Sequence, residues 1–251
     1  MIAHRGFSHV APENTPASFR LALATGVDLV ELDIHQTKDG ELVVFHDREL
    51  DRTTDAVARW KRKHIRVNSK TAAEIQSLDA GAWFAPAFTG TQVPLLSQAL
   101  DVIQNSAIAL IERKSGDPLT LLKLLQDKAL LTKVIVQSFD WCFLSQLHQL
   151  VPDLALAALG PPSRLSNGKK PRNFFRKLSL RTVLMAQKTG AKIVVWNKKI
   201  SKRAVRFAHS RSLRVWTYTI NDLKVATRLL KQGVDGFIRN NPPLIRKAIA
   251  N

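Results

Sequence analysis

The chain has 251 residues, of which 45% are hydrophobic and 23% are charged, a composition that excludes a disordered chain and suits a globular protein. A single cysteine, Cys142, excludes an intrachain disulfide, and the apolar runs are too short for a membrane span. The net charge of +18 predicts attraction to polyanions such as nucleic acid, anionic lipid headgroups or phosphorylated substrates.

The first residues, Met1–Gly6, lack the charged start and apolar stretch of a signal peptide, so we expect no secretory leader. The lack of disulfides suits a reducing compartment. We therefore expect a cytoplasmic protein, and the basic charge adds peripheral association with a membrane to this expectation.

Short β-rich segments alternate with helical segments along the chain. The eight expected strands are Ile2–Arg5, Leu29–His35, Ile108–Arg113, Val134–Ser138, Leu154–Leu159, Lys192–Trp196, Arg214–Thr219 and Gly236–Arg239. Side chains typical of helix starts stand at Thr15, Asp117, Asp140, Ser201 and Asn221. Gly26 and Gly233 are typical of helix ends.

Eight β–α units in a chain of 251 residues predict a TIM (β/α)8 barrel, an α/β fold, with a doubly wound open sheet as the alternative. After the second strand, a hairpin-type turn at 38–40 leads to an additional strand, Leu42–Phe45. We expect one domain over residues 1–251, with a small insertion at about 47–104 between barrel strands 2 and 3. A Thr71-x-x-Glu74 capping box predicts a short helix within it.

The strand Leu29–His35 carries two carboxylates on one face. Because side chains alternate along a strand, Glu31, Asp33 and His35 share the face that points into the predicted barrel. Neighbouring carboxylates repel each other unless a cation lies between them. Since oxygen ligands favour hard ions, the pattern predicts a site for Mg2+ or Ca2+; two solvated acids near a strand end are the alternative.

The strand Ile108–Arg113 is apolar until its C-terminal end, where Glu112 and Lys114 fall on one face. Polar residues at the C-terminal ends of TIM-barrel strands are typical of active sites. Glu112 would add a third carboxylate, and Lys114 a positive charge for a phosphate oxygen. An ordinary surface Glu–Lys pair is the alternative.

Two histidines stand at corresponding positions. His4 ends the first strand beside Arg5, and His46 follows Leu42–Phe45 beside Asp47. A histidine pair can act as acid and base on a phosphodiester because the imidazole pKa lies near neutral pH, and arginine can hold the phosphate with two parallel hydrogen bonds. Which histidine is the acid stays open, and the other five histidines are interpreted as structural.

Several short motifs occur together in a characteristic order and spacing. They are His4-Arg5-Gly6, Pro12-Glu13-Asn14-Thr15, Glu31-Leu32-Asp33, Thr37-Lys38-Asp39-Gly40, His46-Asp47, Arg52-Thr53-Thr54, Ile111-Glu112-Arg113-Lys114 and Val215-Trp216-Thr217. In this ordered set the chain resembles the glycerophosphodiester phosphodiesterase family. The resemblance covers nearly the whole chain and is thinnest from 150 to 210.

The resemblance implies a TIM barrel that uses a divalent metal to hydrolyse glycerophosphodiesters to glycerol 3-phosphate and an alcohol. By motif position it implies metal ligands at Glu31, Asp33 and Glu112, an acid–base pair at His4 and His46, and substrate contacts at Arg5, Lys114 and Trp216. Trp216 would line the glycerol side of the pocket. A lysophospholipase D or a sphingomyelinase D-like enzyme acting on membrane lipids is the alternative, because it would differ only in the acceptor pocket.

The chain departs from the family near the end of strand 8, where Arg239-Asn240 replaces a common Thr-Asp pair; we expect an added positive charge near the barrel mouth. The span Leu154–Asn221 holds 16 Lys and Arg and no Asp or Glu, and Phe174 and Phe175 stand among basic residues. We therefore hypothesise contact with an anionic membrane surface and a lysolipid as a further substrate, with a solvated basic surface as the alternative. A non-enzymatic nucleic-acid-binding protein is the second alternative function, suggested only by the net charge. Without a recognition signature we expect no specific nucleic acid partner.

Overall fold

The computed structural model describes residues 1–104, 106–171 and 176–244. The hypothesised membrane contact at Phe174 and Phe175 lies outside these residues. The chain divides into two compact units, here called the N-terminal unit (Ala3–Lys133) and the C-terminal unit (Val134–Asn251 with Met1–Ile2). In the described ranges, no helix is long and apolar enough to cross a membrane.

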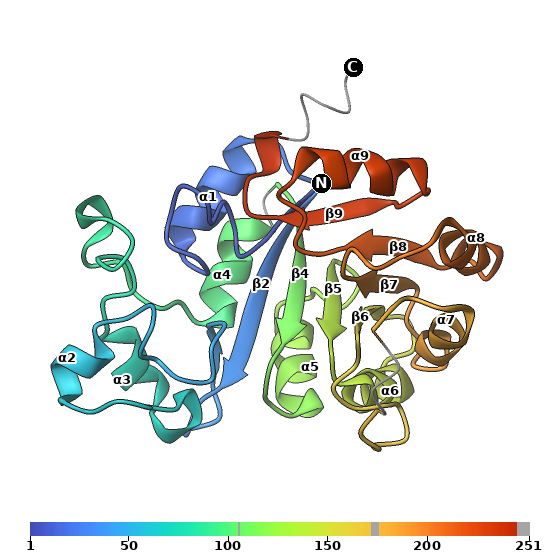
Figure 1. Ribbon diagram of the computed structural model, residues 1–251. Helices are drawn as coiled ribbons and strands as arrows, with labels where there is room; N and C mark the ends of the chain where they lie inside the picture. The colour runs from blue at the N-terminus through green and yellow to red at the C-terminus, as the bar shows by residue number, and fades with distance from the viewer. Residues whose placement is uncertain (105, 172–175, 245–251) are drawn as a thin grey trace. The chain divides into compact units, whose positions relative to one another are not determined.

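The N-terminal unit is organised around the central strand β2. Its strands are β2 (Leu29–Gln36), β3 (Leu42–Val44) and β4 (Ile108–Arg113), and its longer helices are α1 (Pro16–Ala24), α4 (Leu96–Ile103) and α5 (Pro118–Asp127). The short strand β1 (Ile2–Ala3) spans the boundary between the two units. β4 runs parallel to β2, with Glu112 in register with Asp33, and the two lie side by side in Figure 1. β3 runs antiparallel to β2 after a tight turn at Gly40, which has a positive φ of 89°. The predicted hairpin is therefore confirmed.

The predicted helix starts in this unit rest on side-chain caps. The hydroxyl of Thr15 accepts the backbone N–H of Ser18, and the carboxylate of Asp117 accepts those of Leu119 and Thr120. Each cap satisfies a donor that the first helical turn leaves unpaired. Proline follows both caps, where its fixed φ suits the first helical position.

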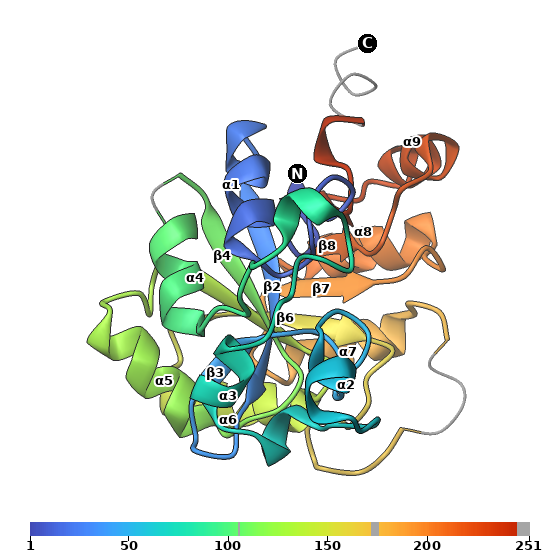
Figure 2. The ribbon, with the colours of Figure 1, turned by 90° about the vertical axis from the view of Figure 1, so that its left-hand side faces the viewer.

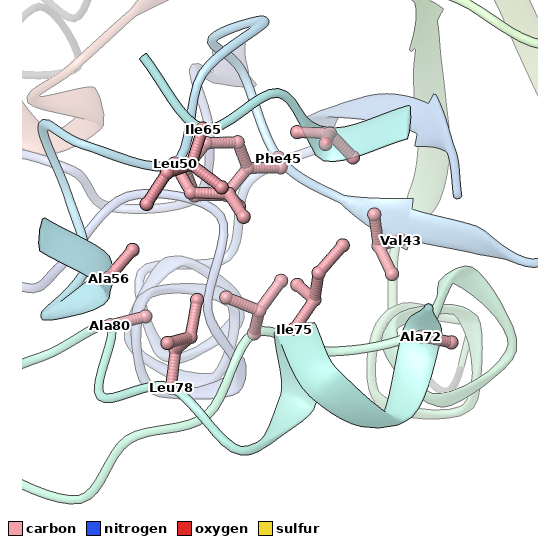
Figure 3. Packing of buried hydrophobic residues seen from close by; sticks show 11 residues of the cluster. Val43, Phe45, Leu50, Ala56, Ile65, Ala72, Ile75, Leu78 and Ala80 are labelled. Carbon is pink, nitrogen blue, oxygen red and sulfur yellow. The ribbon is translucent and has the colours of Figure 1, made fainter. Parts of the chain in front are cut away.

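The predicted insertion folds around an apolar cluster of its own, shown in Figure 3. Its elements are α2 (Ala56–Trp60), η1 (Val67–Ser69), α3 (Ala72–Gln76) and η2 (Pro86–Phe88). The cluster comprises Val43, Phe45, Leu50, Ala56, Ile65, Val67, Ala72, Ile75, Leu78, Ala80 and Val93. The Thr71–Glu74 capping box begins α3 as predicted. The domain boundaries themselves stay a prediction.

The C-terminal unit contains five strands that pair in sequence order, each parallel to the next. They are β5 (Val134–Ser138), β6 (Ala155–Gly160), β7 (Ile193–Trp196), β8 (Arg214–Thr217) and β9 (Gly236–Arg239), and the helices between them are α6 (Trp141–Leu150), α7 (Leu180–Gln187), α8 (Lys202–Ser210) and α9 (Leu223–Lys231). Figure 2 shows α7, α8 and α9 with this part of the sheet. The strands are buried almost throughout, as parallel strands covered on both faces are.

The chain has the predicted TIM (β/α)8-barrel fold. Within the described residues, eight strands alternate with helices along the sequence, and β3 is an additional antiparallel strand beside β2. The strand positions agree with the sequence prediction to within two residues at either end.

One predicted helix start is wrong by one residue. The N-cap of α9 is Asp222, whose carboxylate accepts the backbone N–H of Val225 at 2.8 Å. Asn221 instead accepts the backbone N–H of Asn240 through its side-chain oxygen at 3.0 Å. Both side chains can cap a helix, so the choice depends on the extended backbone of Asp222, which the sequence does not reveal.

Arg239, the last residue of β9, is fully buried, so the positive charge that the sequence adds at the end of this strand is not exposed to solvent. Its three guanidinium nitrogens have no hydrogen-bond partner within the described ranges. Burial of the charged form lowers the pKa of Arg239 to about 10. The guanidinium is therefore a destabilising group in the folded protein.

Replacing Arg239 with methionine is expected to raise the free energy of unfolding by about 1–3 kcal/mol, because it removes unsatisfied buried donors while keeping an apolar stem of similar length. Urea denaturation of the two proteins measures the change. Arg214→Met, at an exposed residue of β8, serves as the control and should change the stability by less than about 0.5 kcal/mol. If Arg239→Met instead destabilises the protein, the guanidinium must form favourable interactions in the folded protein in solution.

Candidate active site

Three buried carboxylates gather at the pairing of β2 with β4. Glu31 and Asp33 lie on one face of β2, and Glu112 stands beside Asp33 on β4. Each carboxylate offers an oxygen, and these oxygens all lie within 4.8 Å of one another. The adjacent residues of β2, Val30 and Leu32, are buried on the opposite face. The alternation of side chains predicted from the sequence therefore brings the carboxylates together.

Two cations from neighbouring segments hold the central carboxylate, Asp33. The Nζ atom of Lys114 lies 3.0 Å from Oδ1 of Asp33 and also contacts Glu112, and Nε of Arg5 lies 3.2 Å from Oδ2. Asn14 donates its side-chain N–H to the same Oδ2 at 2.9 Å. Burial alone would raise the pKa of Asp33, but Lys114 and Arg5 outweigh it and lower this pKa to about 2.

The other two carboxylates are less well compensated. Burial and the adjacent charges of Asp33 and Glu112 raise the pKa of Glu31 well above its usual value. Burial and Asp33 likewise raise the pKa of Glu112 to about 6, although Lys114 opposes the shift. An added cation would relieve this repulsion, and three carboxylates match the oxygen ligands that hard divalent ions prefer. The donor set therefore fits a divalent metal.

The loop that follows β1 is held in an unusual backbone conformation. Arg5, Gly6 and Asn14 all have positive φ, which is uncommon for residues other than glycine. A Cβ on Gly6 would lie 2.7 Å from the backbone carbon of Ser18, so only glycine fits there. The backbone N–H of Arg5 donates to Glu31 at 2.9 Å. The strained loop thus fixes Arg5 and Asn14 against the carboxylates.

A second charged network contains three residues to which the sequence reasoning gave no role. Arg52 bonds Asp47 and Glu13, both at 2.6 Å, and Glu13 also accepts from Arg5 at 2.9 Å. The contacts with Arg52 and Arg5 lower the pKa of Glu13 against the opposing effect of burial. The hydrogen bond from His46, followed by that from Arg52, lowers the pKa of Asp47 against the same effect. Glu13 and Arg52 stand within the family-like motifs, which is the signal that could have identified them. The network links the loop after β1 to the segment after β3.

His46 is oriented from two sides. Its Nδ1 lies 2.6 Å from Oδ1 of Asp47, which keeps the proton on Nδ1 and leaves Nε2 as the atom for proton transfer. His35 lies on β2 with Nε2 at 3.2 Å from the backbone oxygen of His46 and Nδ1 at 2.8 Å from the hydroxyl of Ser115. A carbonyl only accepts, so neutral His35 donates from Nε2 and accepts at Nδ1. His35, interpreted from sequence as structural, is thus positioned to hold the His46 backbone.

Burial lowers the pKa of His35 from 6.5 to about 4. Since the unfolded chain binds this proton more tightly, the stability contributed by neutral His35 is complete above pH 6.5 and is lost as the pH falls towards 4. The loss should reach about 3 kcal/mol. Urea denaturation in chelator measures the free energies of unfolding of the parent protein and of His35→Gln. The difference between the two should shrink as the pH falls from 6.5 towards 4. A difference that stays constant with pH would contradict the assignment.

The remaining predicted site residues are His4 and Trp216. His4 follows β1 directly, is half-buried, and its charge helps to lower the pKa of Asp33. The N-terminal unit therefore brings together every predicted residue except one. Trp216 belongs to the C-terminal unit, where it is buried on β8 with its ring against Gly236. Its contact with glycerol stays a prediction.

Comparisons with known proteins identify the family. The family model for the glycerophosphoryl diester phosphodiesterase family matches residues 4–244. A glycerophosphodiester phosphodiesterase of Bacillus subtilis is 34% identical to this chain, with 98% of this chain and 85% of the relative covered. One from Caldanaerobacter subterraneus is 30% identical, with 98% of each chain covered.

Two solved structures with the same fold are 25% and 26% identical to this chain. A phosphodiesterase of Oleispira antarctica, solved in complex with the product sn-glycerol-3-phosphate, has a TM-score of 0.83 and 25% identity, covering 100% of this chain and 96% of that chain. A glycerophosphodiester phosphodiesterase of Agrobacterium tumefaciens has a TM-score of 0.77 and 26% identity, covering 96% of each chain. With the match across nearly its whole length, this chain belongs to the glycerophosphoryl diester phosphodiesterase family and is a hydrolase.

Proposed function

We propose that this enzyme hydrolyses glycerophosphodiesters to glycerol 3-phosphate and an alcohol with the help of Mg2+ or Ca2+. The observation that carries the proposal is the cluster of Glu31, Asp33 and Glu112, three buried carboxylates with oxygens within 4.8 Å of one another. Such a cluster is costly to bury without a cation. The product bound by the Oleispira antarctica relative is the product expected here.

The proposed ligands are Glu31, Asp33 and Glu112, and the bound cation would supply Lewis-acid polarisation of a phosphoryl oxygen. Lys114 and Arg5, already beside these carboxylates, would hold the negative charge of the phosphate. His46 and His4 would move the protons, with His46 Nε2 accepting or donating while Asp47 holds Nδ1–H. Trp216 would line the glycerol pocket. Which histidine acts first is left to experiment.

Release of glycerol 3-phosphate from glycerophosphoethanolamine and glycerophosphocholine tests the proposal. We expect turnover with added Mg2+ or Ca2+, loss of turnover in excess chelator, and recovery when the metal is restored. Comparing the two ions identifies the working metal. Folded, metal-supplied protein that releases no product from either compound would contradict the proposed substrate class and favour a lipid phosphodiester.

We further infer that the enzyme is cytoplasmic, associates peripherally with anionic membranes and accepts lysolipid phosphodiesters. The excess of basic residues in the C-terminal unit, 16 Lys and Arg without an acidic residue over Leu154–Asn221, supports this inference. Parallel assays with glycerophosphocholine and a lysophosphatidylcholine test the lysolipid substrate. Hydrolysis of the former alone would restrict the enzyme to deacylated substrates.

A further inference from the structure

The insertion contains a cleft of about 790 Å3 that the proposed reaction does not use. We call it the Trp60 cleft; its lining includes Trp60, Arg62, His64, Arg66 and Lys70. Its volume lies in the range of small-ligand sites. The catalytic candidates His4, Glu31, Asp33, His46 and Glu112 do not line it. The cleft is therefore a feature of the insertion and not an extension of the carboxylate cluster.

The loop that forms one wall of the cleft is fixed by several contacts. Lys61 and His64 both have positive φ, which is uncommon for residues other than glycine. The carboxylate of Asp51 then accepts the backbone N–H groups of His64 and Ile65, at 2.6 Å and 3.1 Å. The backbone N–H of Leu50 donates to the oxygen of Ile65 at 2.8 Å. These hydrogen bonds therefore hold the wall of the cleft in a defined conformation.

The charges around the cleft leave two guanidinium groups available. Lys70 forms an ion pair with Glu74 at 2.8 Å and lies 4.1 Å from the centre of the Trp60 ring. Arg62 and Arg66 are exposed and form no ion pair with the part of the chain that the structure describes. Guanidinium groups bind phosphate through paired N–H donors. The cleft is therefore suited to a phosphate-bearing anion.

A metal ion is a less suitable ligand for this cleft than a phosphate-bearing anion. Glu49, Asp51 and His64 offer ligand atoms within 4.8 Å of one another. However, Asp51 already accepts two backbone N–H groups, and Glu49 is paired with His64 at 2.9 Å. Arg62 and Arg66 line the same cleft, and their positive charge disfavours a further cation.

We propose that the Trp60 cleft binds the headgroup phosphate of an anionic glycerophospholipid and docks the enzyme on the membrane surface. One phosphate needs only the two arginines, whereas Lys61 and Lys63 add exposed positive charge beside them. This surplus matches a surface that carries many phosphates. Trp60 packs half-buried against the apolar cluster of the insertion, with Lys70 over its ring, and therefore fixes one wall of the cleft beside the two arginines. The proposal deepens the inferred membrane association but is independent of turnover.

Partition onto phosphatidylcholine vesicles containing phosphatidylglycerol, at low salt, tests the proposal with the full-length protein. Arg62→Gln/Arg66→Gln should weaken vesicle binding by about 25-fold, at about fivefold for each basic residue removed. Arg20→Gln/Lys133→Gln removes the same charge from exposed positions of the same unit and should change binding by less than about twofold. Turnover of glycerophosphoethanolamine should be unchanged in both variants.

Each remaining outcome has a distinct meaning. Equal vesicle binding by the parent and Arg62→Gln/Arg66→Gln would overturn the cleft as the docking site, and no binding by the parent would overturn docking altogether. Titration with inorganic phosphate and glycerol 3-phosphate is the second arm: cleft-dependent binding there without vesicle binding would assign the cleft to a free phosphate. Cleft-dependent binding to an RNA oligomer in place of vesicles would also overturn the proposal. The hydrolysis assay reports separately on the proposed function.

Discussion

Replacing His46 with alanine is expected to lower kcat for glycerophosphodiester hydrolysis by about 10²–10⁴-fold, the usual contribution of a positioned acid or base. The reason is geometric: Asp47 holds Nδ1 at 2.6 Å, and His35 contacts the His46 backbone oxygen at 3.2 Å, so the ring is prepared for proton transfer. The side chain is about 30% exposed, so its removal should leave the fold intact.

Steady-state kinetics with glycerophosphoethanolamine and saturating metal provides the measurement. His209→Ala is the matched control, because His209 also pairs with an aspartate, Asp235 at 2.9 Å, but lies on α8. The control should retain full kcat. If the His46 variant keeps more than about a tenth of the parental kcat, the acid–base role is wrong.

Replacing Lys114 with methionine is expected to lower the free energy of unfolding by about 3–5 kcal/mol when chelator removes the metal. Lys114 contacts Asp33 and Glu112, and these carboxylates raise its pKa against the opposing effect of burial. Its removal leaves Asp33 and Glu112 without a counter-charge that both contact. Saturating Mg2+ or Ca2+ should reduce the loss, because metal binds only the folded cluster.

Urea denaturation of both proteins, in chelator and in saturating metal, measures these four stabilities. Lys128→Met is the control: Lys128 pairs with exposed Asp101 at 2.6 Å, a surface pair that should contribute less than about 1 kcal/mol in either condition. The same loss for Lys114→Met with and without metal would show that lysine and metal do not share the carboxylates. Destabilisation no larger than that of the control would exclude the counter-charge role.

Much of the site was predictable because strand periodicity and strand pairing are encoded locally. The alternation in Leu29–Gln36 places Glu31 and Asp33 on one face, and the late position of Glu112 in its strand brings it into register with Asp33. The contacts of Glu13 and Asn14 were not predictable in this way. They depend on the left-handed backbone at Arg5 and Asn14, which the surrounding structure imposes on residues that seldom adopt it.

The burial of Arg239 was not predictable for a related reason. A charged residue at the end of a strand is usually exposed, and the sequence pattern carries no sign that packing around β9 covers it. His35 was likewise undervalued, because its partner is the backbone of His46 and backbone contacts leave no residue-type signature. Local pattern therefore gives the strands and the charged face, while tertiary contacts determine the positioning residues.

The separate apolar cluster of the insertion has an evolutionary consequence. Nine of its eleven buried residues lie within the insertion and give this segment an interior of its own, and the Trp60 cleft borders that interior. Substitutions among the cationic residues at the surface of the insertion therefore do not disturb the register between β2 and β4. Selection can then change the charge of the insertion's surface while the carboxylate cluster is inherited without change.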